Sequence, residues 1–184
     1  MKYFTPELYQ QLNSFDIEEA ERADEAWDLA EAAYTKRLAS IRENMPSQVA
    51  KLSELCLHDA LVVSRIEETQ SGREFRSSAP TPFPATFFWT AVAIVSVAIG
   101  TEAVSLIYGL CDHTKTNEAP EGWPFSKLQE QWLYDEVDVL NDGRGPFVHR
   151  ILLSTGVTLE IPFVSVIIHR FTVPTVTKKT KQIA

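Results

Sequence analysis

The sequence contains little cysteine, and its first residues lack the pattern of a signal peptide. Only two of the 184 residues are cysteine, Cys56 and Cys111, and they lie far apart without a C-x-x-C spacing. This excludes a disulfide-stapled scaffold, and we predict two buried, reduced thiols. The N-terminus carries one lysine and no continuous apolar run, so we expect no signal peptide.

Basic residues are also scarce relative to acidic ones. The chain has 17 Lys and Arg against 25 Asp and Glu, a net charge of −8. This balance repels phosphate backbones, so we expect no nucleic-acid partner. Between residues 14 and 31 there are eight carboxylates and one basic residue, Arg22. Such a block is typical of the solvated face of a helix.

Recognisable catalytic motifs are lacking as well. No P-loop, G-x-G-x-x-G or G-x-S-x-G sequence occurs, and the four histidines have no H-x-x-x-H or H-E-x-x-H spacing. We therefore predict no metal site and no cofactor. Weak catalytic candidates are the adjacent pair His58 and Asp59, together with Glu136 and Asp138. The alternative for His58 is a cap on the preceding helix, where its ring would bind free carbonyl groups.

Residues 1–57 have the pattern of helices. Thr5 and Pro6 form an N-cap and first-turn pair for a helix ending near Leu12. Asp16 begins a longer helix, in which apolar residues recur every three or four positions from residue 17 to residue 41. A third helix is predicted from about Ser47 to Cys56.

Residues 58–173 have the pattern of strands. Predicted strands follow His58, cover residues 129–141, and form a hairpin over 147–163 with Gly156 at a position of positive φ. Pro162 interrupts the second arm and predicts an edge or a bulge, and residues 163–171 form a last strand. We therefore predict a single α+β domain over residues 1–173, with the N-terminal helices packed on one face of an antiparallel sheet of about six strands. Residues 174–184 are predicted to be a disordered basic tail.

The longest apolar stretch, residues 83–101, has two interpretations. It has the length of a membrane-spanning helix. However, it is rich in Val, Ile, Thr and aromatic residues and is followed by a second apolar run after Gly100 and Thr101. A two-residue Gly-Thr turn would pair Val95 with Leu106 and would place large residues on one face and small residues on the other. This favours a hairpin of a soluble sheet over a membrane anchor.

Polar and aromatic residues in the β-rich part are candidates for a catalytic or binding surface. Strand alternation in WLYDEVDV places Trp132, Tyr134, Glu136 and Asp138 on one face. These side chains either form an acid/base or cation site, or belong to a solvated sheet face paired with Arg150 or Arg144. Trp123 and Phe125 lie in a proline-bearing loop and, with Tyr134, are the predicted binding residues; core packing is the alternative role.

The blocks YFTPELYQQLNS, LHDALVV, WLYDEVDV and HRILLSTGVTLEIPF resemble a group of uncharacterised bacterial proteins with an FTxELY opening. The resemblance spans most of the chain and is weakest over residues 70–100. It implies a bacterial, cytoplasmic protein and supplies no catalytic residues.

Three functions remain open from the sequence. We favour a non-catalytic protein that binds a partner with a basic surface, by analogy with acidic single-domain immunity proteins. The alternatives are a hydrolase, metal-dependent or acid/base, that uses His58, Asp59, Glu136 or Asp138, and a protein anchored by residues 83–101. The oligomeric state is not predicted.

Overall fold

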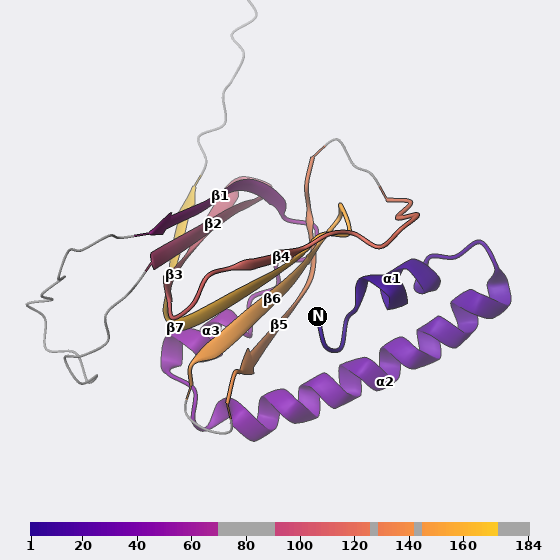
Figure 1. The fold of residues 1–184 in the computed structure, drawn as a ribbon, viewed down its shortest axis with the longest axis horizontal. Coiled ribbons are helices and arrows are strands. Elements are labelled where there is room, and N and C mark those ends of the chain that lie inside the picture. The colour runs from indigo at the N-terminus through magenta and orange to yellow at the C-terminus, as the bar shows by residue number, and fades with distance from the viewer. Residues whose placement is uncertain (70–90, 126–128, 142–144, 173–184) are drawn as a thin grey trace, which may run out of the picture.

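A computed structural model describes residues 1–69, 91–125, 129–141 and 145–172. Its fold is α+β, with three N-terminal helices and an antiparallel seven-stranded sheet (Figure 1). The predicted tail 174–184, residues 83–90 of the possible membrane span, and Arg144 lie outside the described residues.

The helices begin where the sequence predicts. Helix α1 spans Pro6–Leu12, and the Thr5 side chain accepts a hydrogen bond from the Leu8 amide. Helix α2 spans Ile17–Arg42, and the Asp16 carboxylate accepts from the amides of Glu18 and Glu19. Helix α3 spans only Ser47–Leu52. The prediction that it reaches Cys56 is wrong, because the chain turns after Leu52 to place Leu57 and Ala60 in the core.

The strands form one sheet in the order β1-β2-β3-β7-β6-β5, and β4 pairs with the free side of the N-terminal end of β7. All pairings are antiparallel. The bounds are β1 Leu61–Thr69, β2 Ala91–Ile99, β3 Glu102–Leu110, β4 Lys115–Asn117, β5 Trp132–Val139, β6 Phe147–Leu153 and β7 Thr158–Thr172. Strand β4 lies in a segment that the sequence predicts to be loop.

The predicted hairpin register of β2 and β3 is confirmed. Ile99 pairs with Glu102, Val95 with Leu106, and Ala93 with Tyr108. Gly100 has a φ of 60°, as the first central residue of a tight Gly-X turn requires. In the described part of the chain, no helix combines the length and apolarity needed to cross a membrane.

Strand β7 is continuous through Pro162, whereas the sequence predicts a hairpin arm that ends at residue 163 and a separate last strand over residues 163–171. At Phe163 its pairing passes from β6, through Phe147, to β3, through Leu110. A register shift follows at once, because Gly109 pairs with Ser165 rather than with Val164. The bulge predicted near Pro162 is therefore present, and Pro162 lies where the strand changes its neighbour and no regular ladder donor is needed.

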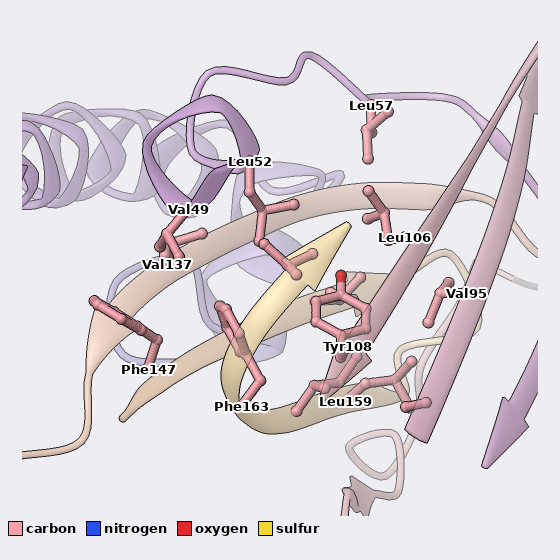
Figure 2. Packing of buried hydrophobic residues seen from close by; sticks show 14 of the residues in the cluster. Val49, Leu52, Leu57, Val95, Leu106, Tyr108, Val137, Phe147, Leu159 and Phe163 are labelled. Carbon is pink, nitrogen blue, oxygen red and sulfur yellow. The ribbon is translucent and has the colours of Figure 1, made fainter. Parts of the chain in front are cut away.

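The sheet curls into a half-barrel whose two edge strands meet at one end. Leu61 at the start of β1 forms a bridge with Gln131, just before β5. The concave face holds the core, which includes Val95, Leu106 and Tyr108. Figure 2 shows Val49 and Leu52 of α3 facing this core beside Phe163.

The N-terminal helices pack on the sheet as predicted, but they reach both of its faces. Helix α3 and Ile41 near the end of α2 pack against the concave face, whereas Trp27 and Arg37 of α2 contact the outer face of β5. Strands β1 and β2 lie at the far end of the sheet from α1 and α2 (Figure 1). The cysteine prediction is wrong in part: both thiols are free, as predicted, but exposed, because Cys56 follows α3 in a loop and Cys111 follows the end of β3.

Candidate functional site

A partly exposed cluster of aromatic rings joins four separate parts of the chain. Tyr134 of β5 lies with its ring centroid 4.6 Å from Trp27 of α2 and 5.9 Å from Tyr9 of α1. Tyr9 also stacks on Trp123, at 5.9 Å, and meets the edge of Phe125, at 5.5 Å. We call these five residues the aromatic cluster. The structure thus brings together the three predicted binding residues, Trp123, Phe125 and Tyr134.

The loop that carries Trp123 is fixed to the rest of the fold. The indole N–H of Trp123 donates to the carbonyl oxygens of Ser154, at 3.0 Å, and Phe125, at 3.2 Å. The ring also lies over Gly156, where an added Cβ would come within 2.6 Å of Trp123 Cδ2. Gly156 has a φ of 80°, as its position in the turn predicts. The ring is therefore held in place by the β6–β7 turn.

Beside the cluster, the ring of Phe4 is buried between α2 and β5. This ring stacks on Tyr134 at 5.6 Å and lies 5.1 Å from Trp27. The cluster has a buried side and a partly solvent-accessible side, since all five of its members are intermediate in exposure. Large aromatic groups in this position supply much contact area at low entropic cost.

Carboxylates surround the exposed side. Burial and then the neighbouring Asp59 raise the pKa of Tyr9. Burial, Tyr9, Asp59 and Glu31 raise the pKa of Tyr134. Burial is the largest cause that disfavours the phenolate form of both tyrosines, and the nearby carboxylates add a negative potential that favours a cation.

His58 and Asp59 lie at the edge of this cluster. His58 Nδ1 is 3.1 Å from Asp59 Oδ2, and the imidazole centroid is 5.0 Å from that of Tyr134. Both side chains are exposed. Because α3 ends at Leu52, His58 does not cap that helix as the alternative interpretation has it.

Helix α2 extends the negative surface. Six carboxylates on it are exposed, those of Glu18, Glu21, Asp24, Glu25, Asp28 and Glu31. Asp24 and Glu31 are three residues before and four after Trp27, so they lie beside its ring on the helix surface. Leu29 on the same helix is 73% exposed. The predicted solvated acidic face is confirmed, although Ile17 is exposed rather than part of a buried stripe.

Glu136 and Asp138 lie in a different environment from His58 and Asp59. Glu136 is fully buried, and its carboxylate accepts from the backbone amides of Lys2, Tyr3 and Phe4 at 2.6–3.0 Å. The predicted solvated face is wrong here, because the N-terminal segment covers it. The Glu136 carboxylate thus holds the N-terminal segment in place, and its oxygens are already occupied by these hydrogen bonds.

Asp138 is held by ion pairs. Its Oδ1 lies 2.8 Å from the guanidinium Nε of Arg37 of α2, and its Oδ2 lies 3.9 Å from Lys2 Nζ. The predicted cross-strand partner Arg150 does face Glu136, with 3.9 Å between Nη1 and Oε2. His58 and Asp59 are exposed, whereas Glu136 and Asp138 are buried and paired. The four catalytic candidates therefore do not share one accessible site.

A third polar group is buried in the core. The Nε2–H of His149 donates to Asp135 Oδ2 at 2.9 Å, and the indole of Trp132 donates to Asp135 Oδ1 at 2.9 Å. Burial raises the pKa of Tyr108, whose hydroxyl lies 2.8 Å from His149 Nδ1 and donates to it. His149 and Tyr108 are completely buried, so this chain of hydrogen bonds fixes β3, β5 and β6 and reaches no substrate.

Trp132 is in this group because of a bulge. A register shift between Trp132 and Tyr134 turns Trp132 to the concave face, so the prediction that both share one face is wrong. Strict alternation holds only from Tyr134 onward.

A cavity of about 360 Å³ is lined by residues of β1, β2, β4 and β7. Its lining includes the apolar residues Val95 and Ile161 and the charged residues Arg65 and Glu67. Both charged groups are already paired: Arg65 with Glu130 at 3.3 Å, and Glu67 with the Thr114 hydroxyl. Among the described residues, no group of three or more His, Cys, Asp or Glu side chains has the arrangement of a metal site.

No protein-family model, curated protein or solved structure matches this chain.

Two members of the aromatic cluster, Tyr9 and Trp27, are absent from the predicted site. Helical spacing assigns Trp27 to a buried stripe, and nothing in the local sequence indicates that α1 and β5 meet. The one hint of this cluster in the sequence is that α1, α2, β5 and the loop before β5 each carry Tyr or Trp residues.

Proposed function

We propose that the protein is a non-catalytic binding protein, and that the aromatic cluster with the carboxylates around it docks a cationic segment of a protein partner. The observation that carries this proposal is the partly exposed set of five aromatic rings with Asp59 and Glu31 close enough to raise the pKa of Tyr134.

The chemistry of the surface selects the partner. The faces of Trp and Tyr rings attract Lys and especially Arg, and Trp and Tyr are the residues that most often dominate binding energy. The carboxylates of α2 add long-range attraction and faster association. The exposed Leu29 favours a segment that carries apolar residues as well as arginines.

A defined probe tests this proposal. A peptide of alternating arginine and leucine is titrated into the full chain while the tryptophan fluorescence is followed, and the same peptide with glutamate in place of arginine is the control. We expect saturable binding of the first peptide only. Tyr134→Ala weakens it about tenfold or more, as for a residue that dominates an interface.

Two double variants, each lacking two carboxylates, distinguish the effect of this surface on binding from the effect of the overall negative charge of the chain. Glu31→Gln with Asp59→Asn removes two carboxylates at the aromatic cluster, and Glu68→Gln with Glu102→Gln removes two exposed carboxylates on the sheet. We expect weaker binding and a smaller salt dependence only for the first pair. Equal effects of the two pairs, or equal binding of both peptides, would overturn the proposal.

A further inference from the structure

Four isoleucines form a straight row across four neighbouring strands. Ile66 of β1 pairs with Ile94 of β2, Ile94 with Ile107 of β3, and Ile107 with Ile167 of β7. Directly paired residues in antiparallel strands point to the same side of the sheet. The row lies on the outer face, because the alternate residues, such as Val95 and Leu106, fill the core.

The neighbouring rows consist mostly of small or uncharged residues. One adjacent row contains Ser64, Ser96, Ser105 and His169, and beyond it lie Ala98, Ala103 and Phe171. The adjacent row on the other side contains Glu68, Val92, Gly109 and Ser165. Across the face, the ionisable groups are Glu68 at one corner and the imidazole of His169. On a chain with a net charge of −8, this is a nearly neutral apolar surface. We call it the isoleucine face.

No described helix covers the isoleucine face. Helices α1 and α2 lie toward β5, and α3 packs on the concave side (Figure 1). Ile66 is 47% exposed and Ile167 52% exposed, although both side chains are large and apolar. A continuous apolar face of this kind marks an interaction surface more often than scattered apolar residues do.

The size of the face suits a modest specific interface. Strands β1, β2 and β3 each have nine residues. Four strands about 4.8 Å apart, with a rise of about 3.3 Å per residue, give a face of about 19 by 30 Å, or about 570 Å². Two such faces would bury about 1,100 Å², just above the roughly 1,000 Å² that a specific interface needs.

The charge distribution selects a second copy of this chain as the occupant. A neutral face meets its own copy without opposing like charges, whereas a strongly charged partner would lose solvation there and gain no ion pair. The acidic surface of α2 lies toward the other end of the sheet, where the two copies would not bring it together. A two-fold axis lets the isoleucines of both copies interdigitate.

We propose that the protein forms a homodimer in which the isoleucine faces of two copies pack against each other, sheet on sheet. The aromatic clusters then remain accessible on both copies. The dimer does not depend on the proposed binding function, and its failure would leave that function intact.

The edge of the sheet offers a different contact, which the structure disfavours. Edge strand β1 has a register shift between Val62 and Ser64, and Arg65, Glu67 and Glu68 along it are exposed. Bulges and charges at an edge oppose strand-to-strand pairing between copies.

Sedimentation equilibrium of the full chain tests the dimer. We expect a mass of twice 20.7 kDa. Ile107→Lys places a charge at the centre of the face and converts the dimer to a monomer, with the dissociation constant raised at least 100-fold. Leu29→Lys makes the same change of an apolar residue to lysine on α2, outside the isoleucine face, and leaves the dimer unchanged.

A milder variant distinguishes loss of the dimer contact from loss of the fold. Ile66→Ser with Ile167→Ser changes the two most exposed members of the row, and circular dichroism reports whether the fold persists. We expect a folded protein with dimerisation weakened about tenfold or more. A monomeric wild-type chain, or a dimer that survives these changes but is lost on Val63→Pro at the β1 edge, would overturn the proposal.

Discussion

Gly156 shows how one residue shapes the binding surface. It lies in the turn between β6 and β7 with a φ of 80°, and the Trp123 ring and the Ala119 side chain fill the space where a Cβ would be. Only glycine combines this backbone conformation with so close a contact. The position of Trp123 in the aromatic cluster therefore depends on a glycine 33 residues later in the chain.

Gly156→Ala is expected to destabilise the fold and displace Trp123. The positive φ costs about 1–2 kcal/mol for an alanine, and the clash with the indole ring adds to this cost. Gly122→Ala is the matched control, because Gly122 has a φ of 76° and nothing within 4 Å of its added Cβ. Urea unfolding should give a larger loss for Gly156→Ala, with altered tryptophan fluorescence. Equal losses would contradict this account.

At the scale of elements, the N-terminal segment depends on a buried carboxylate of β5. Three backbone amides, those of Lys2, Tyr3 and Phe4, donate to Glu136. Tyr34 of α2 reinforces the contact, because its hydroxyl oxygen accepts from the Val137 amide at 2.8 Å. The N-terminal segment and α2 are thus joined to β5 through these polar contacts as well as through the Phe4 ring, which stacks on Tyr134.

Glu136→Gln should release the N-terminal segment. The amide keeps one acceptor but directs an NH₂ group toward amide donors, and charge-assisted hydrogen bonds are worth about 1.5–3 kcal/mol each. We expect a loss of about 2 kcal/mol or more in unfolding free energy and faster hydrogen exchange at residues 2–4. Glu160→Gln is the control, since Glu160 is the other carboxylate beside Arg150 but is half-buried. Unchanged exchange in the Glu136 variant would rule out this anchoring role.

At the scale of the whole molecule, two tyrosines, the half-buried Tyr34 and the buried Tyr108, link stability to pH. Burial is the largest cause that raises the pKa of Tyr34 and of Tyr108 above the ordinary value of 10.0. The unfolded chain therefore loses these protons at a lower pH than the folded chain does. Stability from both residues is present below pH 10 and falls as pH rises above 10.

The unfolding free energy should therefore decline from about pH 10 upward. Urea titrations between pH 8 and 12, with tyrosinate absorbance, measure this decline. Tyr108→Phe removes one of the two groups, so its free-energy difference from wild type should shrink as pH rises. A constant difference across this range would show that Tyr108 does not contribute.

Much of the fold follows from local sequence patterns. The N-caps at Thr5 and Asp16, the register of the β2–β3 hairpin and the turn at Gly156 were predictable because each depends on neighbouring residues. The strand bulge at Trp132 and the continuous path of β7 through Pro162 were not, because each depends on which strands lie alongside.

The sequence by itself determined the α+β class, the acidic face of α2 and the hairpin around Gly100, since periodicity and turn chemistry act over a few residues. Only the tertiary structure decided that β1 meets β5, that Glu136 holds the N-terminus, and that Tyr9, Trp27 and Tyr134 meet in one cluster. These are contacts between residues far apart in the chain. Their partners are chosen by the curl of the sheet and by the competition for buried space, which no local pattern records.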